Sequence, residues 1–170
     1  MAKRGPKLKG DHKITSTEAK RKHDDMYASI DQQLDTARLE IDWERRNEAE
    51  KSLTNWVKTY CIGILLDDEP PPHGYEVLEE MARALDDVRP YMIMMGRGGG
   101  KSCYVECASC YVIATGKRKF PVAISANAKA AQGILADIFR MFQEPDTPFA
   151  QDYPDLCIPI QIANGSYRRK

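Results

Sequence analysis

A cluster of glycines separates a short apolar run from a segment suited to a helix. Residues 91–95 are apolar and have the length of a buried strand. Glycines and one arginine follow at 96–100, then Lys101 and Ser102, and residues 103–114 are compatible with a helix. A strand, a glycine-rich turn, a Lys-Ser pair and a helix in this order predict a phosphate-binding P-loop.

Each residue type in this stretch has a physical role in holding phosphate. Glycines allow a sharp turn and bring bare backbone N–H groups close to phosphate oxygens. The N-terminus of the following helix adds partial positive charge. Lys101 would supply a full charge to the β and γ phosphates, and Ser102 would offer a hydroxyl to Mg²⁺. The predicted nucleotide-binding residues are Gly96, Arg97, Gly98, Gly99, Gly100, Lys101 and Ser102.

The loop is a variant of the usual pattern. Met95 occupies the position at which that pattern has its first glycine, and Gly96 follows one step later. A glycine-rich turn with a chance Lys-Ser pair is the alternative. The apolar run before the loop and the helical segment after it favour the phosphate site.

The composition is that of a chain with a core and no overall charge. Its 170 residues are enough for one domain, and 25 basic residues balance 25 acidic ones. This balance gives no general argument for a nucleic-acid or membrane partner. The sequence has neither an apolar span of about 18 residues nor the apolar core of a signal peptide. We therefore expect a cytoplasmic protein without a membrane partner.

The cysteines fit a reducing compartment. There are five of them, an odd number. Cys103, Cys107 and Cys110 lie on the helix expected after the glycine loop. A metal site there would need a fourth ligand, and no histidine or further cysteine lies nearby in the sequence. Small core residues are therefore the favoured interpretation.

The chain divides into three parts. Residues 1–25 are polar and basic and predict a disordered tail, which either touches DNA phosphates or only solubilises the terminus. Residues 26–66 predict one or two long helices, with a break near Asp35 or Trp43. A proline-rich connector leads to residues 73–170, which we expect to form an incomplete P-loop ATPase domain. The domain begins with an amphipathic helix of about three turns.

The order of elements predicts an α/β fold. Residues 120–125 are a second strand candidate, and a clean apolar helical face runs from residue 131 to 142. Strand, helix, strand and helix with short connections predict a parallel sheet with flanking helices, preceded by the long helical N-terminal region. Residues 156–162 look like a further strand, and residues 163–166 like a hairpin turn.

An acidic strand is missing from this pattern. P-loop ATPases also need a strand that ends in an acidic residue to hold magnesium, the Walker B strand. No hydrophobic strand ending in an Asp or Glu pair follows the glycine loop here. We therefore expect the chain to be the N-terminal piece of a longer motor domain, truncated before this strand. Little or no ATP hydrolysis is expected from residues 1–170 alone.

Several segments resemble one known family. The loop 97–102 matches the arginine-glycine-x-glycine-lysine-serine/threonine loop that is frequent in the large subunit of tailed-phage terminases. Residues 73–81 and 89–95 are similar to the segments before that loop. Residues 122–139 and 160–166 look like the family's second strand and helix and the strand and turn that follow. The resemblance covers roughly residues 45–170.

The resemblance implies a viral DNA-packaging motor driven by ATP and Mg²⁺. In that family an N-terminal ATPase domain moves double-stranded viral DNA through the portal, and a C-terminal nuclease domain cuts it. The implied partners are this DNA, the portal and the small terminase subunit, with a homo-oligomeric ring of the full-length protein in the cytoplasm of the infected bacterium. Arg97 would sense the γ-phosphate. No catalytic acid carries over.

Two other functions remain open at this point. The chain could belong to another P-loop enzyme, such as a helicase-like ATPase or a nucleotide kinase. It could also be a non-catalytic fragment that serves in assembly. The sequence beyond residue 170 would distinguish a terminase from another P-loop enzyme, because an acidic strand followed by an acidic nuclease cluster is typical of the terminase.

Overall fold

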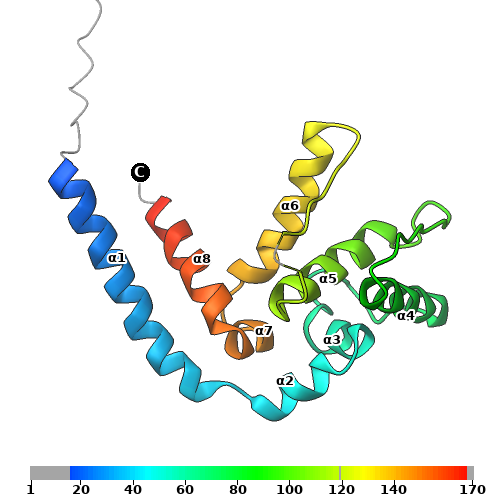
Figure 1. The fold of residues 1–170 in the computed structure, drawn as a ribbon, viewed down its shortest axis with the longest axis horizontal. Coiled ribbons are helices and arrows are strands. Elements are labelled where there is room, and N and C mark those ends of the chain that lie inside the picture. The colour runs from blue at the N-terminus through cyan, green and yellow to red at the C-terminus, as the bar shows by residue number, and fades with distance from the viewer. Residues whose placement is uncertain (1–15, 119, 168–170) are drawn as a thin grey trace, which may run out of the picture.

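Helices make up the regular structure of this chain. The computed structural model describes residues 16–118 and 120–167. The elements in chain order are α1 (Ser16–Ala37), a 3-10 helix η1 (Arg38–Glu40), α2 (Trp43–Glu50), α3 (Leu53–Tyr60), α4 (Pro72–Asp86), α5 (Lys101–Ala114), α6 (Ala128–Gln143), α7 (Pro148–Asp152) and α8 (Pro154–Tyr167). Figure 1 shows them as a curved arrangement, with α3 near its centre and α1 at one side.

The predicted α/β fold with a parallel sheet is wrong. No β-strand occurs in the described ranges, where an isolated bridge between Ile62 and Leu66 is the extent of β-pairing. The expected strands 91–95 and 120–125 have no regular structure, and no backbone hydrogen bond joins them. Strand geometry is stabilised by such pairing, so an apolar run without a paired neighbour stays irregular.

The third expected strand is a helix. Residues 156–162 lie inside α8, and the expected hairpin at 163–166 lies in its last turns. A short apolar run fits a buried helix as well as a strand by periodicity alone. Pro154 at the start of α8 favours the helix, because its fixed φ suits the first helical position and its missing N–H is not needed there.

The helices that periodicity predicts are present. α4, α5 and α6 cover the expected segments. α1 to α3 cover most of the predicted helical N-terminal region, with interruptions at residues 38–42 and 51–52, but its last residues, 61–66, are not helical. Asn127 caps α6, where its side chain accepts a hydrogen bond from the Ala130 N–H at 2.9 Å. Residues 16–25, expected to belong to a disordered tail, are helical in α1. The rest of that predicted tail lies outside the described residues.

The core is built around α3. Its Leu53, Trp56 and Val57 are completely buried. Trp56 packs edge-on against Phe149 of α7 and Tyr111 of α5, with ring centroids 5.7 and 5.8 Å apart. Burial of each large side chain of this kind stabilises the fold by about 2 to 3 kcal/mol. α3 therefore joins the N-terminal helices to α5 and α7.

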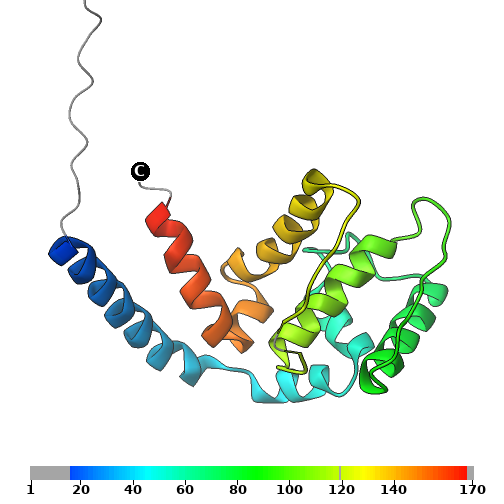
Figure 2. The same ribbon diagram turned by 45° about the horizontal axis from the view of Figure 1, so that its top comes forward.

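The α1 helix pairs with α8. Figures 1 and 2 show the two helices side by side. Ile30 and Leu34 of α1 are buried. Beyond the end of α1, the Arg38 Nη2 donates to Asp155 Oδ1 of α8 at 2.6 Å. No described helix has both the length and the apolar character required to cross a lipid bilayer.

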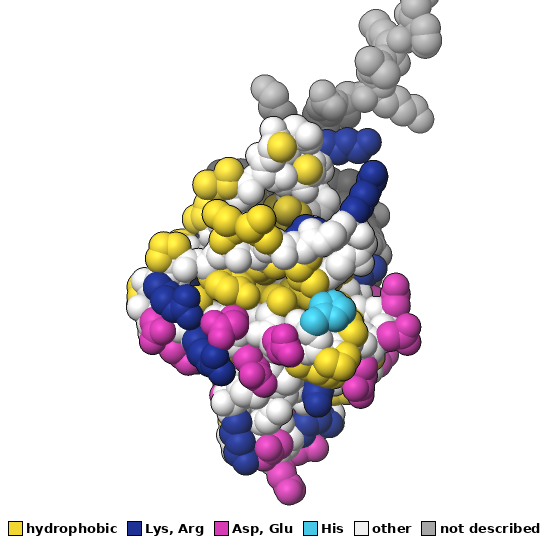
Figure 3. Space-filling model, turned by 90° about the vertical axis from the view of Figure 1, so that its right-hand side faces the viewer, with side chains coloured by type: hydrophobic (Ala, Val, Ile, Leu, Met, Phe, Trp, Pro, Cys, Tyr) yellow, Lys and Arg dark blue, Asp and Glu magenta, His cyan; other side chains and the backbone are white. Residues whose placement is uncertain are grey.

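The irregular segments leave apolar side chains in solvent. Met94 is 87% exposed and Ile124 is 90% exposed. The two segments border one hollow of about 390 Å³ beside α4 and α5, with Tyr91 and Phe120 among its lining residues. Figure 3, which views the side of the molecule at the right of Figure 1, shows hydrophobic side chains gathered in a band across it.

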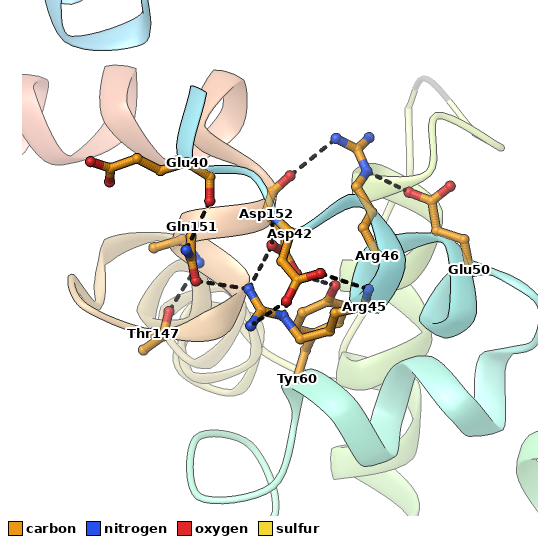
Figure 4. A network of polar contacts seen from close by, with 10 residues as sticks. Glu40, Asp42, Arg45, Arg46, Glu50, Tyr60, Thr147, Gln151 and Asp152 are labelled. Carbon is orange, nitrogen blue, oxygen red and sulfur yellow. Dashed lines mark hydrogen bonds and ion pairs between the residues drawn. The ribbon is translucent and has the colours of Figure 1, made fainter. Parts of the chain in front are cut away.

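A buried carboxylate links α7 to α2 and α3 by hydrogen bonds. Asp152 has no exposed surface. Its oxygens accept hydrogen bonds from the Arg45 Nε at 2.7 Å, the Arg45 Nη2 at 2.6 Å and the Tyr60 hydroxyl at 2.6 Å. The Asp42 N–H adds a fourth bond at 3.1 Å. Figure 4 shows how these groups surround the carboxylate. Burial is the largest cause that raises the pKa of Tyr60 far above its ordinary value, and the hydrogen bond to Asp152 is the second.

We predict that Asp152→Asn destabilises the fold by about 3 kcal/mol, because the Arg45 guanidinium and the Tyr60 hydroxyl lose charged acceptors in a water-poor site. Urea denaturation measures the change. Asp155→Asn is the matched control: Asp155 also bonds an arginine, but its side chain is 51% exposed. Little change is expected there. Equal losses in the two variants would contradict the importance assigned to the buried contact.

Candidate functional site

The glycine loop has the backbone conformation that its residues predict. Gly98 and Gly100 have φ angles of +82° and +77°, in the left-handed region. The Gly99 N–H donates to the Gly96 carbonyl at 3.2 Å and closes a tight turn. Gly100 is the N-cap of α5, and its carbonyl accepts the first helical hydrogen bond from the Tyr104 N–H at 3.0 Å. The chain therefore turns sharply and enters the helix at Lys101.

The start of α5 presents free donors. Among the described residues, no acceptor pairs with the backbone N–H groups of Lys101 and Ser102. Such groups at a helix N-terminus carry partial positive charge and attract anions. The glycines beside them have no side chain to obstruct an approaching oxygen. This end of α5 has the donors and the access that an anion requires.

The charged side chains of the loop lie differently from one another. The Lys101 ammonium bends back over the loop and donates to the Gly96 carbonyl at 2.8 Å and the Met95 carbonyl at 3.0 Å. An anion in the loop would compete with these carbonyls for the ammonium. Arg97 is exposed, and its side chain has no hydrogen bond or ion pair with the described part of the chain. Ser102 is exposed on the first turn of α5.

A hollow of about 380 Å³ lies between the loop and the start of α4. Its lining residues are Pro71, His73, Gly96, Arg97, Gly98, Gly99, Gly100 and Tyr104. No carboxylate is among them. Because Pro71 is the N-cap of α4, the N-termini of α4 and α5 border the same space. Both helix dipoles therefore favour negative charge there.

The upstream helix places one of its two candidate ligand groups at this hollow. His73 and Tyr75 lie at the start of the helix that precedes the loop, and this position in the sequence makes each a candidate for ligand contact. His73 lines the hollow. The Tyr75 hydroxyl instead donates to Glu69 at 3.1 Å, and the Lys58 ammonium lies over the Tyr75 ring. The structure therefore places only His73 of this pair beside the glycine loop.

Sequence reasoning missed two residues beside the loop. Tyr104 lines the hollow, although its place one turn into α5 is typical of a core residue. Gly74, inside α4, faces it so closely that a Cβ atom at position 74 would lie 2.3 Å from the Tyr104 hydroxyl oxygen. A glycine inside an amphipathic helix was the available signal, since such a residue weakens a helix and frequently has a packing reason.

Two of the three cysteines of α5 are core residues, as their sequence context indicates, whereas Cys103 is half-buried and lies outside the core cluster. Cys107 and Cys110 are fully buried, and burial raises the pKa of Cys110 well above its ordinary value. Across residues 16–118 and 120–167, no group of three or more His, Cys, Asp or Glu side chains is placed to hold a metal ion. For Mg²⁺ at the glycine loop, Ser102 could supply one oxygen ligand.

A buried carboxylate lies on the same helix, at the side facing α6. Glu106 is 6% exposed. Burial raises the pKa of its carboxyl group, the nearby Asp137 raises it further, and Arg140 opposes the shift. Glu106 does not line the hollow beside the glycine loop. Its burial therefore affects how α5 packs against α6, and it is not part of the candidate site.

The comparisons with known proteins identify no relative. Protein-family models find no match in this chain, and searches of curated proteins and of solved structures likewise find no similar protein. The resemblance to terminases therefore stands on the residues of the loop and its flanking segments.

We predict that Gly100→Ala destabilises the protein by about 2 kcal/mol. Alanine is strained at a φ angle of +77°, and its Cβ would lie 3.2 Å from the Tyr104 ring. Gly96→Ala is the control, because its φ angle is not in the left-handed region and its Cβ would meet no atom within 4 Å. Chemical denaturation of both variants measures the difference. A tolerated Gly100→Ala would contradict the assigned loop geometry.

The pKa shift of Glu106 predicts a pH effect. A carboxyl group with a raised pKa stabilises the fold while protonated, below its ordinary pKa of 4.5, and this contribution is lost as pH rises through the folded-state value. We expect Glu106→Gln to raise the free energy of unfolding at neutral pH and to flatten its decline with pH. Denaturation at acidic and neutral pH tests this, with the exposed Glu79→Gln as the control. A variant that is less stable than the natural chain at neutral pH would refute the expectation.

Proposed function

We propose that residues 96–102 bind the phosphates of ATP with Mg²⁺, and that the chain is the ATP-binding part of a viral DNA-packaging motor of the terminase large-subunit type. The observation that carries the proposal is the glycine loop itself. It ends at a helix N-terminus whose first N–H groups have no acceptor among the described residues, and it holds the Lys101 ammonium against its own carbonyls. Loop amides, a helix dipole and a lysine are the groups that hold a polyphosphate.

The proposed roles follow from where each group lies. The free N–H groups at the start of α5 donate to phosphate oxygens, and the Lys101 ammonium exchanges the Gly96 carbonyl, now 2.8 Å away, for phosphate. Ser102, on the first turn of α5, supplies a hydroxyl to Mg²⁺. Arg97 has no competing ion pair among the described residues and is available to the γ-phosphate. These roles need a loop and a helix, and they do not depend on a sheet.

The proposed motor function is a function of the whole protein, and the loop contributes nucleotide binding to it. The match of residues 97–102 to the terminase loop favours a packaging ATPase over another nucleotide-binding protein. The proposed partners are double-stranded viral DNA, the portal and the small terminase subunit, with a ring of full-length copies in the host cytoplasm. Within this proposal, the role of the loop is nucleotide binding.

Lys101→Ala tests the phosphate site. Loss of a charged donor to phosphate is expected to weaken ATP·Mg²⁺ binding by about 10- to 100-fold. Isothermal titration calorimetry measures this affinity. Lys51→Ala removes the same charge from the exposed end of α2 and should bind as the natural chain does. Equal affinity of the two variants, or no binding by the natural chain, would contradict the proposed function.

A further inference from the structure

A buried tyrosine next to the glycine loop has an unused hydroxyl. Tyr104 is 3% exposed. Among the described residues, no donor or acceptor pairs with its hydroxyl, and the hydroxyl oxygen itself is not fully buried, because every fully buried side-chain oxygen or nitrogen of these residues has a partner. Because Tyr104 lines the hollow beside the loop, its hydroxyl keeps access to that space. A hydroxyl that has no protein partner and opens into a hollow can bond there to water or to a ligand.

Two glycines leave the space that this tyrosine side chain occupies. A Cβ atom at Gly74 of α4 would lie 2.3 Å from the Tyr104 hydroxyl oxygen, and one at Gly100 would lie 3.2 Å from the ring. Any larger residue at either position would displace the ring. The tyrosine is therefore wedged between the first turn of α4 and the end of the loop, with its hydroxyl between the two helix N-termini.

The positive charge around this hydroxyl favours an anionic partner. Arg97 and His73 line the same hollow, no carboxylate does, and the dipoles of α4 and α5 both point their positive ends toward it. Burial raises the pKa of the Tyr104 phenol, so the hydroxyl keeps its proton at neutral pH and can donate it. A donor in a site of positive potential suits an anionic oxygen.

We propose that the Tyr104 hydroxyl donates a hydrogen bond to a phosphate oxygen of the ligand held by residues 96–102. This inference rests on the proposed function, because it assigns one more contact to the same polyphosphate. It adds a contact from the α4 side of the loop, away from the Lys101 ammonium. The hollow of about 380 Å³ between the loop and α4 is then part of the ligand site.

Tyr104→Phe removes the hydroxyl and keeps the ring between the two glycines. We expect the variant to bind both ATP·Mg²⁺ and inorganic tripolyphosphate about tenfold more weakly in calorimetry, since a hydrogen bond to a charged acceptor is lost. Thermal unfolding without ligand should stay the same. Tyr111→Phe is the matched control. Tyr111 is a buried tyrosine on the same helix that does not line the hollow, and loss of its hydroxyl should leave both affinities unchanged.

The outcomes separate this inference from the proposed function. Failure of the natural chain to bind either probe would overturn both. If Lys101→Ala abolishes binding and Tyr104→Phe binds as the natural chain does, the site stands and the Tyr104 contact is refuted. A loss confined to ATP, with tripolyphosphate unaffected, would place the contact on the nucleoside and overturn its assignment to phosphate. Gly74→Ala, which displaces the hydroxyl, should weaken both probes in the same way as Tyr104→Phe.

Discussion

The structure depends on burial of the aromatic face of α3. Trp56 has no exposed surface and meets rings from α5 and α7, so a helix early in the chain is held against segments far along it. The Asp152 carboxylate strengthens the same junction through Arg45 and Tyr60. Apolar burial supplies most of the stabilisation here, and the polar contacts fix which helices meet because a buried carboxylate requires its partners.

This core also sets the position of the candidate site. α4 and α5 both pack against α3, and their N-termini border one hollow next to the glycine loop. Tyr104 connects the two helices, since its ring occupies the space that glycines at positions 74 and 100 leave open. An N-terminus from each of two helices creates a positive potential that neither sequence segment produces alone. The site is therefore a product of helix packing as well as of the loop.

Local chemistry explains which parts could be predicted. The periodic apolar faces of α4 and α6 are visible in the sequence because each depends on residues within a few turns. The loop conformation follows from Gly98 and Gly100, whose positive φ angles other residues rarely adopt. The predicted strands are absent, because a strand depends on a paired neighbour and local pattern does not show whether one is present. Residues 91–95 and 120–125 lack such pairing, and residues 156–162 are helical instead.

The sequence by itself determined the helices α4, α5 and α6 and a glycine turn leading into α5, since backbone freedom at glycine and apolar periodicity act over short distances. Only the tertiary structure decided that α4 begins beside that turn, that Tyr104 lies between Gly74 and Gly100, and that its hydroxyl opens into a space free of carboxylates. These relations join residues on two different helices. Their distances depend on how both helices pack on α3, and no local pattern contains that information.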